Sequence, residues 1–140
     1  MDLDRITLPV LGDAARNGID AGGLLEGARP EAIYAHVPFC RHKCHYCDFY
    51  SIVASEDRHA PFTAALIKEL ETLSAVATQP IETIFVGGGT PTLLDPKHWS
   101  ALLTALDRLF DLAPIRQGRG EFTVECNPET ATPELFDALV

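Results

Sequence analysis

The chain has 140 residues, a length that fits one domain. Eleven Lys and Arg residues against twenty Asp and Glu residues give a net charge of −9, which argues against general nucleic-acid binding and against electrostatic attachment to anionic lipid. Apolar residues make up 46% of the chain, enough for a buried core, and no run approaches the roughly 20 apolar residues of a transmembrane helix. The N-terminus lacks the basic start and apolar stretch of a secretory signal, so we expect a soluble, cytoplasmic protein.

Residues 1–30 differ from the rest of the chain, because repeated glycines interrupt every apolar pattern there. This composition predicts a flexible leader. After it, Ala32–Val37 is a short β-prone run that Pro38 closes. We then predict a loop over residues 39–50, which is rich in cysteine, histidine and aromatic side chains.

Two helices and a strand are predicted in the middle of the chain. Residues 57–77 have helical periodicity, with an apolar stripe formed by Phe62, Leu66, Leu70, Leu73 and Ala77. Residues 81–86 predict a second strand, which three consecutive glycines end. Asp95 is an N-cap candidate for the next helix, with Pro96 at its first position. The apolar face of that helix contains Trp99, Leu102, Leu103, Leu106, Leu109 and Phe110.

The last part of the chain repeats the alternation. A loop over residues 113–120 precedes a third strand over residues 121–126, in which Cys126 is expected to be a small buried apolar residue. Thr132 and Pro133 then open a third helix. Strands that alternate with helices imply an α/β fold of parallel strands with crossover helices. Because three such strands leave long edges unpaired, we expect about three βα units of a larger domain.

Three of the four cysteines, Cys40, Cys44 and Cys47, have the spacing C-x3-C-x2-C. Three thiolates on one loop can converge on one metal centre. A [4Fe–4S] cluster that three cysteines hold leaves one iron free to bind a small molecule. The alternative is a structural zinc site with His42 or His45 as the fourth ligand. A group of unligated reactive thiols is a third interpretation.

Three sequence blocks, in the same order and spacing, are similar to those of a known superfamily. The blocks are Ile33-Tyr34-Ala35-His36-Val37-Pro38-Phe39-Cys40 with the following cysteine loop to Ser51, Phe85-Val86-Gly87-Gly88-Gly89-Thr90-Pro91-Thr92, and Glu125-Cys126-Asn127-Pro128-Glu129-Thr130. In these blocks the chain closely resembles the radical S-adenosylmethionine (SAM) superfamily. Within it, the chain is similar to the oxygen-independent coproporphyrinogen III oxidases and the HemW-type haem chaperones. The resemblance implies that residues 31–140 are the N-terminal portion of a partial (β/α) barrel, the radical SAM core domain.

The resemblance also implies a site in which the cluster on the three cysteines binds SAM. The residues that resemblance places against SAM are Tyr34, Gly88, Gly89, Thr90 and Glu125. Tyr46, between the second and third cysteines, is expected to lie against a bound cofactor, with loop packing as its alternative. Arg41 and Lys43 are expected to stabilise the thiolates. A phosphate-binding loop is not expected, because no Lys-Ser or Lys-Thr follows the glycines.

Two functions within this group compete. The oxidases usually carry a fourth cysteine two residues after the third, where this chain has Phe49, and the segment from Glu125 to Pro128 is more similar to the chaperone branch. The resemblance therefore favours a HemW-like protein that binds haem and delivers it to acceptor proteins, with an electron-donor protein as a further partner. Oxidation of coproporphyrinogen in porphyrin biosynthesis is the alternative, and a zinc-binding module is the second alternative. Cluster binding by this chain need not bring activity, because the expected remainder of the barrel would supply the substrate surface.

Overall fold

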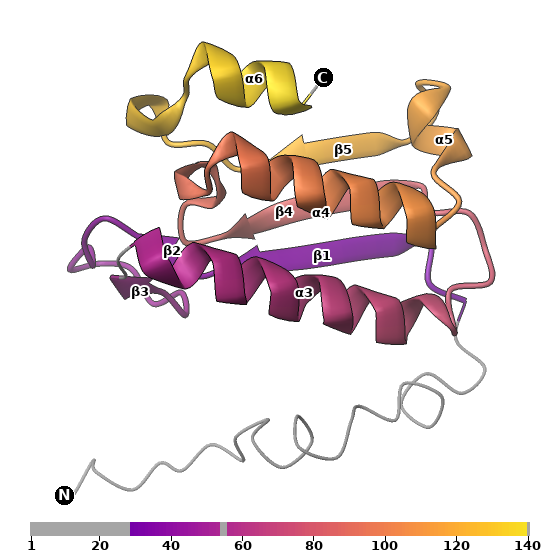
Figure 1. Ribbon diagram of the computed structural model, residues 1–140, viewed down its shortest axis with the longest axis horizontal. Helices are drawn as coiled ribbons and strands as arrows, with labels where there is room; N and C mark the ends of the chain where they lie inside the picture. The colour runs from indigo at the N-terminus through magenta and orange to yellow at the C-terminus, as the bar shows by residue number, and fades with distance from the viewer. Residues whose placement is uncertain (1–28, 54–55, 140) are drawn as a thin grey trace, which may run out of the picture.

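The computed structural model describes residues 29–53 and 56–139, so nearly all of the predicted leader over residues 1–30 lies outside the described residues. A parallel sheet of three strands forms the centre of the described part (Figure 1). Its strands are β1 (Ala32–Val37), β4 (Thr83–Gly88) and β5 (Glu121–Val124), and they lie in that spatial order. Each crossover therefore leads to the neighbouring strand.

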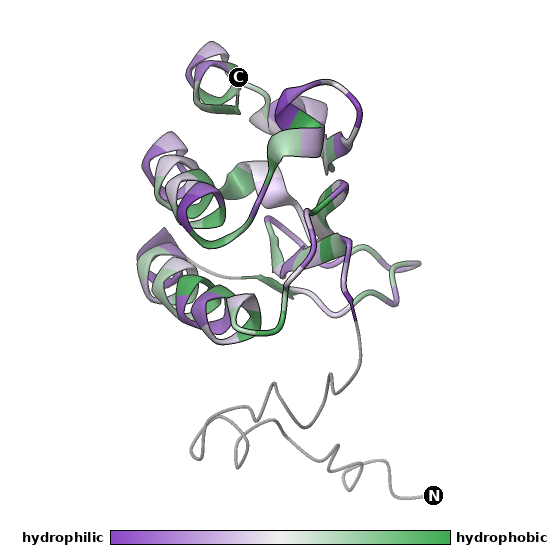
Figure 2. Ribbon diagram, turned by 90° about the vertical axis from the view of Figure 1, so that its right-hand side faces the viewer, coloured by the Kyte–Doolittle hydropathy of each residue, from purple (hydrophilic) through white to green (hydrophobic). Residues whose placement is uncertain are grey.

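Three helices cover one face of the sheet. They are α3 (His59–Ser74), α4 (Pro96–Leu109) and α6 (Pro133–Leu139), and Figure 2 shows them on the same side of the strands. Strands in chain order with helices on a single side are typical of a (β/α) barrel segment, whereas doubly wound sheets reverse their strand order and carry helices on both faces. The predicted α/β fold, a partial barrel with parallel strands, is confirmed.

Alternating side chains of the strands divide between the helix-covered face and the open face. On the covered face, Ala35 and Val37 of β1 and Val86 of β4 are almost completely buried. They pack in one core cluster with apolar residues of the helices, Leu70, Trp99, Leu102, Leu106 and Leu135. On the open face, the rings of Tyr34 and Phe85 stack with their centroids 6.0 Å apart. No helix in the described part of the chain combines the length and the apolar character that crossing a bilayer requires.

The bounds of several elements differ from the sequence prediction. The predicted helix over residues 57–77 is shorter, because a 3-10 helix (Glu56–Arg58) precedes α3 and α3 ends at Ser74. The second strand begins at Thr83 and continues to Gly88, because two glycines that were expected to end it pair with the last residues of β1. The predicted loop over residues 113–120 contains one short helix, α5 (Ala113–Arg116).

One prediction about a side chain was wrong, that of a buried Cys126, and the predicted N-cap position of Asp95 is confirmed without a side-chain cap. Asp95 lies at the N-cap of α4, and Pro96 begins the helix as predicted, but the Asp95 carboxylate caps no backbone amide. It pairs instead with the ammonium group of Lys97 at 3.1 Å. Cys126 is exposed rather than buried. The reason is that β5 ends at Val124. Residue 126 therefore lies outside the strand, where side chains no longer alternate between the two faces of the sheet, and it is not directed toward the helices.

Candidate functional site

The candidate site lies at the edge of the sheet where all three strands end, at the left of Figure 1. Parallel strands bring their carboxyl ends to the same edge, and sites of β/α barrels are built there. Three segments therefore meet at this edge: the cysteine loop after β1, the glycine segment at the end of β4 (residues 87–89) and the segment after β5 that begins at Glu125.

The cysteine loop is closed at its base by two very short strands that sequence analysis did not predict. Strands β2 (Phe39–Cys40) and β3 (Ile52–Val53) pair in parallel. The Lys43 ammonium group bridges the loop, because it donates hydrogen bonds to the carbonyl oxygen of Phe49 at 2.7 Å and to the hydroxyl of Ser51 at 3.0 Å. Lys43 therefore donates to two oxygen atoms on the far side of the loop and helps to hold the loop closed.

The three cysteines line one cavity of about 170 Å³. Residues of the glycine segment line the same cavity. Sequence analysis assigned the cysteines to the metal and the glycines to SAM, and the structure brings both groups to one space. Of the predicted residues, the lining includes Cys40, Cys44, Cys47, Tyr46, Gly88, Gly89 and Thr90. Within residues 29–53 and 56–139, no group of three or more Cys, His, Asp or Glu side chains is arranged to hold a single metal ion.

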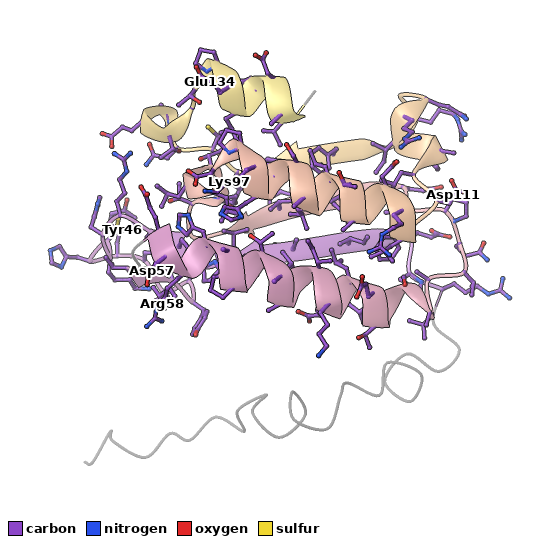
Figure 3. All side chains as sticks on the ribbon, in the orientation of Figure 1. Tyr46, Asp57, Arg58, Lys97, Asp111 and Glu134 are labelled. Carbon is purple, nitrogen blue, oxygen red and sulfur yellow. The ribbon has the colours of Figure 1, made fainter. Side chains whose placement is uncertain are left out.

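The aromatic residue of the cysteine loop is largely free of packing. Tyr46 is 88% exposed, and Figure 3 shows it at the end of the molecule where the strands end. Its hydrogen bond to the Cys44 sulfur and the negative charge of the Cys44 and Cys47 thiolates raise the pKa of Tyr46 above its ordinary value of 10.0. The phenol therefore stays protonated near neutral pH. Of the two candidate fourth ligands, His42 has its Nε2 atom 3.5 Å from the Cys44 sulfur, and both His42 and His45 are exposed.

The glycine segment has no room for side chains. Gly88 has a φ of 115°, and a Cβ there would come within 2.6 Å of the His36 ring. At Gly89 a Cβ would lie 2.5 Å from the carbonyl oxygen of Phe39. The backbone of the glycine segment is thereby seated against the start of the cysteine loop, with hydrogen bonds from Gly89 N to Val37 O and from Thr90 N to Phe39 O, each 2.7 Å long.

Glu125 crosses the end of the sheet toward the glycine segment. Its Oε2 atom accepts a hydrogen bond from the Gly88 amide at 3.0 Å. Gly87 leaves the path open, because a Cβ at that position would lie 2.8 Å from the same oxygen. Glu125 lines a neighbouring hollow of about 310 Å³, which shares Gly89 and Thr90 with the cysteine cavity. The carboxylate is thus adjacent to the cavity of the cysteines without lining it.

Tyr34 is farther from the cysteine cavity than the other predicted residues. Its ring is 60% exposed on the open face of the sheet, and it lines a different hollow, between β1 and α3. His36 connects Tyr34 to the cysteine loop, because its Nδ1 atom lies 3.0 Å from the Tyr34 hydroxyl and its Nε2 atom 2.8 Å from the Tyr50 carbonyl oxygen. A carbonyl only accepts, so Nε2 donates to Tyr50, and in the neutral imidazole Nδ1 then accepts from the Tyr34 hydroxyl.

Sequence reasoning missed the wall of the cavity that the segment after β5 supplies. Asn127, Glu129 and Thr130 line the cavity with the cysteines. The Glu129 carboxylate lies 3.9 Å from the guanidinium of Arg41, so Arg41, like Lys43, has an oxygen partner. The sequence signal for this wall was the pair Asn127-Pro128, which is typical of a turn directly after a strand.

Comparison with known proteins places this arrangement in a family. The Radical SAM superfamily matches residues 34–140. The chain is 34% identical over 111 residues to the haem chaperone HemW of Lactococcus lactis, and the match covers 79% of this chain and 27% of the relative. It is 39% identical over 118 residues to HemW of Mycobacterium tuberculosis, a match that covers 79% of this chain and 28% of the relative.

An oxidase and a solved structure are also similar to this chain. The oxygen-independent coproporphyrinogen III oxidase of Bradyrhizobium diazoefficiens is 33% identical over 111 residues, covering 77% of this chain and 24% of that protein. The structure of coproporphyrinogen III oxidase (HemN) from Escherichia coli, described as a radical SAM enzyme, superposes with a TM-score of 0.70 at 26% identity, over 79% of this chain and 25% of that one. The chain spans about a quarter of the length of these relatives. It belongs to the radical SAM superfamily.

Proposed function

We propose that residues 31–140 carry the cluster- and SAM-binding part of a HemW-like haem chaperone. The observation that supports this proposal most strongly is the shared cavity, in which three cysteine thiols from one loop face the glycine segment from another. The family implies a [4Fe–4S] cluster and SAM in general terms. The proposal assigns both to this particular cavity.

The donor set of the cavity fits a polynuclear cluster. Thiolates are the ligands that iron–sulfur clusters use, and each cysteine of a [4Fe–4S] cluster binds a different iron. The three sulfurs must therefore surround a volume rather than meet at one point. Cys40, Cys44 and Cys47 line a common cavity, as such a cluster requires. We propose these three residues as the cluster ligands.

The surrounding residues fit the proposed SAM site. We propose that the carbonyl oxygens of Gly88 and Gly89 and the hydroxyl of Thr90 contact the polar amino-acid end of SAM, because these residues line the cavity of the cysteines while both glycine amides already donate within the protein. The Glu125 carboxylate, in the adjacent hollow, is suited to accept hydrogen bonds from ribose hydroxyls or from a cationic group. Tyr34 and Tyr46 are proposed as further contacts. When bound, the cluster and SAM supply reductive cleavage of a carbon–sulfur bond, while these side chains bind and orient.

The choice of a chaperone over an oxidase depends on two observations. The HemW relatives quoted above are 34% and 39% identical to the chain, against 33% for the oxidase. In addition, Phe49 occupies the position at which the oxidases usually carry a fourth cysteine. Haem, haem-acceptor proteins and an electron donor are the partners that this proposal requires. Coproporphyrinogen oxidation remains the second candidate.

The cluster assignment is tested by anaerobic reconstitution of the 140-residue chain with iron and sulfide, followed by metal analysis and EPR. We expect about four irons per chain in the wild type and loss of the cluster in Cys44→Ala, because two thiolates do not hold it. The matched control is Cys126→Ala, which removes an exposed cysteine outside the loop and leaves the iron content unchanged. Stoichiometric zinc without a [4Fe–4S] signal would favour the zinc-binding module instead.

The haem assignment is tested separately. Titration of the reconstituted chain with haem is expected to saturate, and incubation with coproporphyrinogen III and SAM to give no decarboxylated product. Appearance of that product would favour the oxidase. A chain that loads the cluster but binds no haem would contradict haem binding by residues 31–140 and leave the cluster assignment standing.

A further inference from the structure

Two buried threonines join the loop after β4 to the loop after β5. Thr92 belongs to the 3-10 helix Pro91–Leu93, and Thr130 to the 3-10 helix Pro128–Thr130. Their side chains are 6% and 7% exposed, and their hydroxyl oxygens lie 2.5 Å apart, although the residues are 38 positions apart in the chain. Two hydroxyls buried against each other form a directional contact between the loops, rather than general packing.

The surrounding hydrogen bonds determine the direction of each proton. The Thr130 hydroxyl donates to the carbonyl oxygen of Asn127 at 2.8 Å, and the Asn127 amide donates to the Thr92 hydroxyl at 3.3 Å. A hydroxyl has a single proton, and that of Thr130 is already used. Thr92 must therefore donate to Thr130. The result is a closed ring of three hydrogen bonds that starts at the amide of Asn127 and returns to the carbonyl of the same residue.

This ring borders the cavity of the proposed SAM site. Asn127 and Thr130 line the cysteine cavity, and Thr92 comes three residues after Gly89, the last glycine of the glycine segment. The end of β4 and the start of the loop after β5 also touch where Glu125 accepts from the amide of Gly88. Side-chain hydrogen bonds thus join the two segments at two points, and four of the proposed SAM contacts, Gly88, Gly89, Thr90 and Glu125, belong to these same segments. A change in the ring would alter the separation of the two walls.

From this geometry we infer that Thr92 and Thr130 are positioning residues for SAM, which set the distance between the glycine segment and Glu125. The inference rests on the proposed function. Each of the three protons in the ring has an acceptor, so loss of one hydroxyl leaves a buried donor without its partner and removes the restraint between the loops. Serine at position 92 retains the hydroxyl and thus the ring.

The test compares Thr92→Val and Thr130→Val with Thr92→Ser in the reconstituted chain, with the dissociation constant of SAM measured by calorimetry. Each valine variant is expected to weaken SAM binding by about tenfold, the scale of one lost buried hydrogen bond. Thr92→Ser should stay within about twofold of the wild type, since its ring is intact. The double valine variant should resemble either single one, because the ring is already open after one change.

The matched control is Thr63→Val. Thr63 is 4% exposed, and its hydroxyl donates to the carbonyl oxygen of His59 within α3 at 2.8 Å, outside the cysteine cavity. This variant is expected to lower the melting temperature as the ring variants do and to leave SAM affinity unchanged. Amide hydrogen exchange adds a measurement that does not need SAM. Thr130→Val should speed exchange of the Gly88 amide, because the hydrogen bond from that amide to Glu125 joins the same two segments.

Two results would overturn the inference. One is an unchanged SAM affinity in both valine variants, and the other is an unchanged rate of exchange at Gly88 in Thr130→Val. A wild-type chain that loads its cluster but binds no SAM would instead overturn the proposed function, and the inference with it. The two failures are therefore distinguishable from the wild-type measurement alone.

Discussion

Replacement of Gly89 by alanine tests how tightly the glycine segment is seated. The added Cβ would lie 2.5 Å from the carbonyl oxygen of Phe39 and 2.8 Å from the carbonyl carbon of Pro38, and neither backbone atom can rotate away. Overpacking of this kind costs about 1–3 kcal/mol. The two 2.7 Å hydrogen bonds, from Gly89 N to Val37 O and from Thr90 N to Phe39 O, would weaken as well, at about 0.5–1.5 kcal/mol each. We therefore expect Gly89→Ala to reduce the free energy of unfolding by roughly 2–6 kcal/mol.

Gly118→Ala is the control for the loss of a glycine as such. Gly118 has a φ of 68°, and a Cβ there would meet nothing within 4 Å. Its replacement should reduce the free energy of unfolding only by the cost of holding alanine in a left-handed backbone conformation, about 1–2 kcal/mol. Urea denaturation followed by circular dichroism measures both variants. If Gly89→Ala proved no less stable than Gly118→Ala, the close approach between the glycine segment and the cysteine loop would not exist as described.

Three further predictions concern the helices. Burial, followed by the positive charge of Lys97, lowers the pKa of His98 below its ordinary 6.5, so the folded state binds this proton less readily than the unfolded state. The urea midpoint should fall as the pH drops below 6.5, and His98→Gln should remove that part of the dependence. Arg108→Ala breaks an exposed 2.8 Å ion pair with Glu71 and should change stability by less than about 1 kcal/mol in the same assay. Leu135→Ala removes a side chain that is 2% exposed in the core cluster, and a calorimetric melt should show a loss of about 2–5 kcal/mol.

Sequence patterns predicted those parts of the fold whose signals are local. The bounds of β1 were predicted to the residue, because a short β-prone run meets Pro38. The start of α4 was predicted from Pro96, whose fixed φ suits the first helical position. The cysteine triad was visible for the same reason, since its three members fall within eight residues.

The errors come from contacts between residues far apart in the chain. Gly88 continues β4 only because Val37 of β1 is there to pair with it. Strands β2 and β3 have two residues each, too few to show a period, and exist because each pairs with the other. The hydroxyl ring could not be predicted either, since nothing near Thr92 in the sequence points to Thr130. Most of the candidate site depends on such non-local contacts, even though its most conspicuous residues do not.

The two sides of the cysteine cavity differ in how firmly they are held. Behind the glycine segment lie buried threonines and backbone hydrogen bonds to β1. The cysteine loop, in contrast, presents Tyr46, Phe49 and Tyr50 to solvent, and these side chains are 66–88% exposed. Rigid elements place functional groups more accurately than loops do. If the glycine segment sets the position of a ligand while the cysteine loop adapts to the cluster, variants on the two sides should differ in what they lose. Variants of Thr92 or Thr130 should change SAM affinity at normal iron content, whereas cysteine variants should lose the iron itself.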